Sequence, residues 1–119
     1  MPLDIYWPDS HLNSLRIDYD LVRIDVTEFG GRERVLLAAG PIGVEQVGLW
    51  DEVIIEMATV SDDHAFAARC WSDIQRRHQD AFDSGSPSRN GRRFQTLEIT
   101  FQDGSALRVA AAQFAFEGD

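Results

Sequence analysis

The chain has 119 residues, of which 44% are hydrophobic, and a formal net charge of −9. This length fits a single domain that buries a core without cross-links, and the one cysteine, Cys70, excludes an internal disulfide. The sequence has no basic start followed by an apolar run and no stretch of about 20 apolar residues. It therefore predicts a cytoplasmic protein that does not enter a membrane.

The acidic excess lies in the first half of the chain. Residues 1–66 hold 13 acidic residues and four arginines, whereas residues 67–119 hold seven of each. Such a field repels nucleic acid and anionic lipid and attracts a basic protein. The charge therefore predicts a basic protein partner and argues against nucleic acid or membrane binding, although acidity also serves solubility alone.

A hairpin over residues 15–26 is the first predicted element. Two alternating runs, 15–19 and 22–26, can pair around a tight turn at Asp20-Leu21. In this register Arg16 faces Asp25 and Asp18 faces Arg23 across the strands. The apolar residues then share the opposite face and enter the core: Leu15, Ile17, Tyr19, Val22, Ile24 and Val26.

Three more strands precede a helix. A strand over about 34–39 is ended by Gly40-Pro41, a second covers 44–49, and a third, rich in branched residues, covers 53–60. The period then changes, because Phe66, Cys70 and Ile74 recur at four-residue steps, and Ser61 or Asp62 can cap the start of the helix. This pattern predicts a helix over about 62–81, followed by an exposed loop over 83–93.

The tail predicts a second hairpin, over residues 95–116. Its apolar residues share one face if Phe101 pairs with Leu107 and Ile99 with Val109 around a loop of Asp103, Gly104 and Ser105. The fold class is thus α+β, a single domain over residues 1–119. It consists of a twisted antiparallel sheet, open or partly closed, with one amphipathic helix packed against it.

Catalytic and metal-binding patterns are weak. Asp9, Ser10 and His11 hold the residue types of a hydrolase triad, but adjacent residues of an extended chain point to opposite sides, so we expect Asp9 and Ser10 to fasten the chain instead. His64, Cys70 and His78 are six and eight residues apart, and eight residues of helix span roughly 12 Å, too far to share one ion. We therefore predict no catalytic residue, no metal and no cofactor.

Carboxylates beside an aromatic form the best candidate surface. Trp50 precedes Asp51 and Glu52, and this arrangement suits an aromatic anchor with acidic steering groups, although Trp50 is as readily a core residue. The arginines of residues 89–93 suit a solvated loop. The predicted partner-binding residues are Asp18, Asp20, Asp25, Trp50, Asp51, Glu52 and Glu56.

The order of motifs resembles a group of small β-rich bacterial immunity proteins of polymorphic or contact-dependent toxin systems. The resemblance rests on Trp7-Pro8-Asp9-Ser10 before the first hairpin, on Val44, Val47 and Trp50, and on Asp103-Gly104 in the closing hairpin. Trp7, Asp9, Ser10 and Gly104 are its structural residues. The resemblance implies a non-enzymatic inhibitor that binds one cognate toxin inside the producing cell.

Two other interpretations remain open. One is a protein that binds a small ligand, or a modest enzyme, with a pocket between sheet and helix that uses Asp51, Glu52 and His64. The other is a structural dimer joined through a free strand edge. The sequence does not decide between a monomer and a homodimer.

Overall fold

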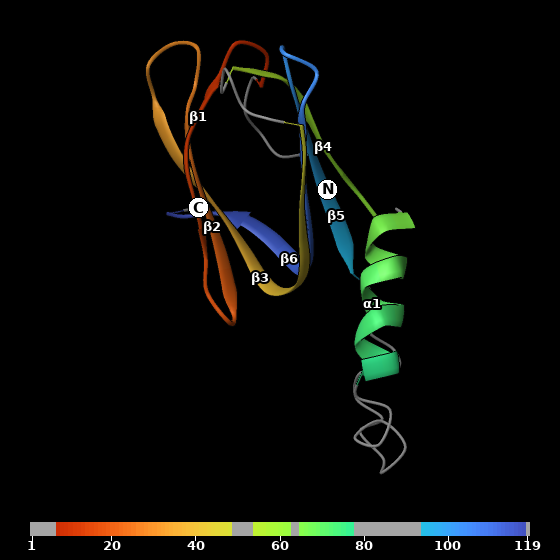
Figure 1. Ribbon diagram of the computed structural model, residues 1–119. Helices are drawn as coiled ribbons and strands as arrows, with labels where there is room; N and C mark the ends of the chain where they lie inside the picture. Colours follow the sequence, from red (N-terminus) through yellow and green to blue (C-terminus); the bar gives the residue numbers. More distant parts are fainter. Residues whose placement is uncertain (1–6, 49–53, 63–64, 78–93, 119) are drawn as a thin grey trace.

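The computed structural model describes residues 7–48, 54–62, 65–77 and 94–118, and these form a six-stranded antiparallel sheet with one helix (Figure 1). The order of strands across the sheet is β1-β2-β3-β6-β5-β4. This arrangement confirms the predicted α+β class. The elements are β1 (His11–Ile17), β2 (Leu21–Thr27), β3 (Glu33–Val47), β4 (Ile55–Ser61), α1 (Ala65–Arg77), β5 (Gln95–Phe101) and β6 (Ala106–Phe116).

The sheet is open, but its two edges meet at one point. His11 at the start of β1 forms an isolated antiparallel bridge with Ile54, which precedes β4. Beside it the Asp9 N–H donates to the Ile55 carbonyl at 2.9 Å, and the Ile55 N–H donates to the Ser10 carbonyl at 2.7 Å. The chain before β1 is thereby fastened to the opposite edge of the sheet.

Two apolar clusters lie on the two faces of the sheet. Successive side chains of a strand point to opposite faces, and in β6 Val109 and Ala111 join the larger cluster while Ala110 joins the smaller one. The larger cluster includes Trp7 and Phe114 and fills the inner face. The smaller one lies on the outer face, where α1 packs, and it includes Phe66, Ala67, Phe94, Cys70 and Trp71.

The first hairpin differs from the predicted register by two residues. Its two-residue turn is Tyr19-Asp20, one residue before the predicted turn, and it is closed by a 2.9 Å hydrogen bond from the Asp18 N–H to the Leu21 carbonyl. As a result Arg16 faces Arg23 instead of Asp25. The ion pairs run along each strand, with Arg16 3.2 Å from Asp18 and Arg23 3.4 Å from Asp25.

Two side chains predicted to enter the core lie outside it. Tyr19 belongs to the turn and is 99% exposed, and Ile17 at the end of the edge strand β1 is 59% exposed. Leu15 is partly buried, and Val22, Ile24 and Val26 are buried. A shift of two residues keeps each side chain on its face, so the face was predicted correctly and the position of the turn was not.

The predicted break at Gly40-Pro41 is wrong, because β3 runs unbroken from Glu33 to Val47. β2 pairs with β3 only as far as Ala39, whereas β6 pairs with β3 from Leu36 to Val47. Beyond Ala39 the strand has lost one neighbour, and its register with β6 shifts between Pro41 and Gly43. Proline is tolerated at such edges and bulges, so it bends the strand without ending it.

The second hairpin keeps the predicted three-residue turn, but the turn is residues 102–104 instead of 103–105, which shifts the register by two residues. Ile99 pairs with Leu107 and Leu97 with Val109, so Phe101 does not face Leu107. The turn closes with a 3.0 Å hydrogen bond from the Phe101 N–H to the Ser105 carbonyl, and Gly104 takes φ +90°. Glycine adopts this φ without the steric cost that a side chain imposes.

Helix α1 lies within the predicted range and approaches β3 closely. A Cβ added to Gly43 would lie 2.3 Å from the Cys70 Sγ and 3.5 Å from the Phe66 ring. Trp71 packs on Phe94, with ring centroids 5.1 Å apart. The absence of a side chain at Gly43 is therefore what lets the helix sit on the sheet. The predicted loop 83–93 lies outside the described residues.

We predict that Gly43→Ala destabilises the protein by about 1–3 kcal/mol, because the added methyl group overlaps the Cys70 sulfur. Cys70→Ala removes the sulfur, so the double variant should be more stable than the sum of the two single changes predicts. Urea unfolding of all four proteins measures this coupling. Additive effects would contradict the proposed contact between Gly43 and Cys70.

Candidate functional site

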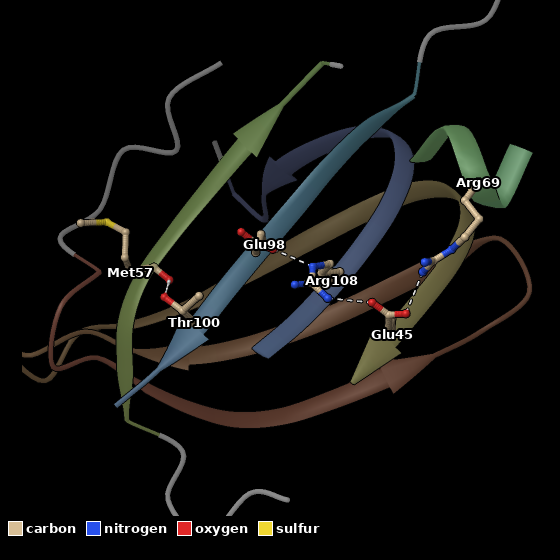
Figure 2. A network of polar contacts seen from close by, with 6 residues as sticks. All are labelled: Glu45, Met57, Arg69, Glu98, Thr100 and Arg108. Carbon is tan, nitrogen blue, oxygen red and sulfur yellow. Dashed lines mark hydrogen bonds and ion pairs between the residues drawn. The ribbon is translucent and has the colours of Figure 1, made fainter. Parts of the chain in front are cut away.

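A row of charged side chains crosses the outer face of the sheet. Glu45 on β3, Arg108 on β6 and Glu98 on β5 are direct cross-strand neighbours. The Arg108 guanidinium donates from Nη1 to Glu45 Oε1 at 2.7 Å and from Nε to Glu98 Oε2 at 2.6 Å (Figure 2). The register of the central strands thus assembles one arginine between two carboxylates.

Helix α1 adds a second arginine to this row. Arg69 donates from Nη2 to Glu45 Oε2 at 2.7 Å, so each oxygen of Glu45 accepts from a different guanidinium (Figure 2). The Arg69 guanidinium also lies 5.2 Å from the centre of the Phe66 ring. Arg69 is 60% exposed and Arg108 26%, so the helix arginine occupies the solvent side of the cluster.

These side chains line an open hollow of about 380 Å³ beside the start of α1. Its walls combine two carboxylates, two guanidiniums and the Phe66 ring. We call it the outer hollow. The residues that line it are Glu45, Ala65, Phe66, Arg69, Glu98 and Arg108.

Ion pairing fixes the charges in the outer hollow. The hydrogen bond from Arg108 is the main cause that lowers the pKa of Glu45, while the bonds to Glu98 and Glu45 raise the pKa of Arg108. A general acid or base needs a pKa near the working pH. These shifts move the pKa values of Glu45 and Arg108 further from neutral pH. The hollow is therefore suited to binding polar groups and poorly suited to proton transfer.

An apolar rim borders the charged row. Val47, Ala106, Thr100 and Met57 form the next cross-strand row, away from the helix. Its two outer members are exposed, Val47 by 43% and Met57 by 47%. The Thr100 hydroxyl donates to the Met57 carbonyl at 3.4 Å (Figure 2). Charged centre and apolar rim together have the mixed character of a protein-binding surface.

The tip of the β1–β2 hairpin presents a different surface. Tyr19 is 99% exposed, and the exposed carboxylates of Asp18 and Asp20 flank it. Ile17, at the end of β1, adds 59% exposed apolar surface. We call residues 17–20 the hairpin tip. It combines an aromatic side chain with two acids at the end of a projecting hairpin (Figure 1).

The structure does not gather the predicted partner-binding residues into one patch. Asp18 and Asp20 lie in the hairpin tip, and Asp25 lies in β2, where the Ser14 hydroxyl donates to it. Glu56 is exposed in β4 and follows Ile54, which bridges to His11 at the far end of β1. Six residues of strand, about 20 Å, separate that end from the tip. Trp50, Asp51 and Glu52 lie outside the described residues.

Trp7, Asp9 and Ser10, on which the resemblance rests, make contacts that hold the chain in place before β1. Trp7 is buried, with its ring 6.3 Å from that of Phe116. Asp9 takes φ 64°, a conformation that aspartate tolerates better than most residues, and accepts a 2.7 Å hydrogen bond from Gln102. Ser10 is buried, and its N–H donates to the Trp7 carbonyl at 3.0 Å.

The described part of the chain has neither a metal-binding cluster nor a membrane-spanning helix. There, no three His, Cys, Asp or Glu side chains are placed to hold a metal ion, and no helix has the length and hydropathy to cross a membrane. Burial raises the pKa of the Cys70 thiol, which disfavours the reactive thiolate. His64 and His78 lie outside the described residues.

Sequence reasoning missed all four charged residues of the outer hollow. Glu45 and Arg108 are 63 residues apart, and nothing local links them. One indication was present, because Glu98 faces Arg108 only when Ile99 pairs with Leu107. Matching charges as well as apolar faces would have selected the observed register of the second hairpin.

We predict that Glu45→Gln lowers stability by roughly 1 kcal/mol at pH 7, because both arginines lose a charged acceptor. Glu45 has a lowered pKa in the folded protein, so its contribution is complete above its ordinary value of 4.5 and disappears as the pH falls below it. Urea unfolding between pH 7 and pH 3 should show the difference from wild type shrinking with acidity. Glu56→Gln, at an exposed position, is the control; a pH-independent deficit in the Glu45 variant would contradict the ion pairing.

Comparisons of this chain with protein-family models, with curated proteins and with solved structures found no match. The resemblance to immunity proteins therefore stays a prediction. Two surfaces of the chain itself, the outer hollow and the hairpin tip, bear on its function.

Proposed function

We propose that this protein is a non-enzymatic binding module for a basic protein, and that it neutralises a cognate toxin as the immunity proteins it resembles do. The observation that carries the proposal is the hairpin tip, where a 99% exposed tyrosine stands between two exposed aspartates. Tyrosine is enriched at the energetic centres of interfaces because it buries a large area at low entropic cost.

The charge of the chain supports a basic partner. A net charge of −9 attracts a positively charged surface over long range and raises the association rate. At the hairpin tip Asp18 pairs with Arg16 at 3.2 Å, but both side chains are largely exposed, and such pairs are weak. Asp18 is therefore able to exchange Arg16 for a basic group of the partner.

The hairpin tip suggests how inhibition would work. A toxin that acts on an anionic substrate, such as a nucleic acid, needs a basic groove. Aspartates entering that groove would take the positions of substrate phosphates, and Tyr19 would bury its ring against the groove wall. A compact tip at the end of a hairpin suits such insertion better than a flat face does.

An enzyme is the less supported alternative. In the described residues, the carboxylates that line the outer hollow, Glu45 and Glu98, are held by arginines, which favours their ionised state. The polar groups predicted for a small-ligand pocket, Asp51, Glu52 and His64, lie outside the described residues.

Co-expression with the protein encoded by the neighbouring gene tests the proposal. We expect rescue from toxicity and a stable complex. Tyr19→Ala should weaken the complex about 30-fold, as for an interface residue worth about 2 kcal/mol. Asp18→Asn with Asp20→Asn should slow association roughly tenfold at low salt and less at high salt.

Phe29→Ala is the matched control, because Phe29 is a 72% exposed aromatic in the turn between β2 and β3. It should leave affinity unchanged. Surface plasmon resonance gives the rates, and circular dichroism checks that each variant is folded. Absence of both complex and rescue would refute the toxin proposal, and equal losses for Tyr19→Ala and Phe29→Ala would refute the role of the hairpin tip.

A further inference from the structure

We propose that Glu45 and the Phe66 ring form a receptor for an arginine side chain of the basic partner, which Arg69 fills in the free protein. The inference rests on the proposed function, since it specifies how the same basic partner is recognised. It adds a second contact surface, the outer hollow, to the hairpin tip.

The geometry around Arg69 contains the two elements that recognise a guanidinium group. Glu45 Oε2 accepts from the Arg69 guanidinium at 2.7 Å, and the Phe66 ring centre lies 5.2 Å from its central carbon. A carboxylate supplies charge and direction, and an aromatic face supplies cation–π attraction. Arg69 therefore shows which ligand chemistry this site accepts.

Arg69 is the displaceable member of the cluster. Its side chain is 60% exposed on a helix, so it can swing into solvent without leaving a buried charge. Arg108 is only 26% exposed and is held by both Glu45 and Glu98. It therefore keeps its place in the hollow when Arg69 leaves. The hollow of about 380 Å³ has room for one incoming side chain once Arg69 leaves.

Arginine fits the site better than lysine. A planar guanidinium lies flat against an aromatic ring and presents several donors in a fixed plane, whereas an ammonium is a compact, strongly hydrated charge. The net charge of −9 favours a cationic ligand over an anionic one in spite of the two arginines nearby.

Occupation by Arg69 sets the affinity for an external ligand. A side chain tethered beside its site competes at an effective concentration in the millimolar range. A capped single arginine should therefore bind the wild-type protein weakly. Removing the tethered competitor should raise the affinity by on the order of tenfold.

The test is a titration with Nα-acetyl-arginine methylamide, followed by NMR shifts of Phe66 and its neighbours. Arg69→Ala should bind the probe about tenfold more tightly than wild type, and the matching lysine compound should bind more weakly than the arginine probe. Arg76→Ala is the control, because Arg76 is an exposed arginine of the same helix that pairs with Asp73 instead. Adding Glu45→Gln to Arg69→Ala should abolish the gain.

Three results would overturn the inference: no tighter binding by Arg69→Ala than by Arg76→Ala, equal binding of the lysine compound, or an unchanged gain after Glu45→Gln. Thermal unfolding checks that the variants are folded. The probe requires no toxin, so the two proposals fail separately. If the protein forms a complex with the neighbouring protein but does not bind arginine, only the arginine site is refuted. If it binds arginine but forms no such complex, the arginine site is supported and the toxin proposal is refuted.

Discussion

The pairing of β3 with β6 is the interaction on which the rest of the described structure depends. We call this pairing the seam. The strand order places β1, β2 and β3 on one side of the seam and β6, β5 and β4 on the other. The two strands pair from Leu36 with Phe116 to Val47 with Ala106. This length is possible only because β3 continues past Gly40-Pro41, beyond the last residue that pairs with β2. The seam therefore joins the N-terminal hairpin to the C-terminal one.

Both candidate surfaces follow from that seam. Its outer face brings Glu45 beside Arg108, and Gly43, two residues before Glu45, leaves the space in which α1 rests. The helix then delivers Arg69 to Glu45, so the outer hollow exists only while the helix is seated on the sheet. The hairpin tip depends on the seam in another way, because β3 supports β2 along its whole length and lets β1 and β2 project their turn into solvent.

Under the proposed function, the two surfaces would contribute differently to recognition, one at long range and one at short range. The hairpin tip carries exposed acids and an unburied aromatic, which suit attraction and anchoring of a basic partner. The outer hollow is closer to neutral and geometrically specific, because each oxygen of Glu45 is already directed at a guanidinium. A partner that used both would gain rate from the first and selectivity from the second.

Local pattern in the sequence determined which segments become strands or helix and which face each side chain takes. Alternation put Val22, Ile24 and Val26 in the core, and the four-residue spacing of Phe66 and Cys70 indicated the helix. Both turns were predicted one residue too late in the chain, which shifts each register by two residues, because alternation fixes a face and leaves the register free by such steps. Tyr19 was therefore expected in the core and instead lies in the turn.

Only the tertiary structure decided the candidate sites. Glu45, Arg69, Glu98 and Arg108 meet through pairing over as many as 63 residues, and a contact of that range leaves no periodic trace in the chain. The sequence showed the acidic excess of the first half of the chain. It did not show how those acids are distributed between the hairpin tip and the far end of β1. The physical reason is the same in both cases: charge and periodicity are properties of a segment, whereas proximity is set by strand register and by the space that one glycine leaves for a helix.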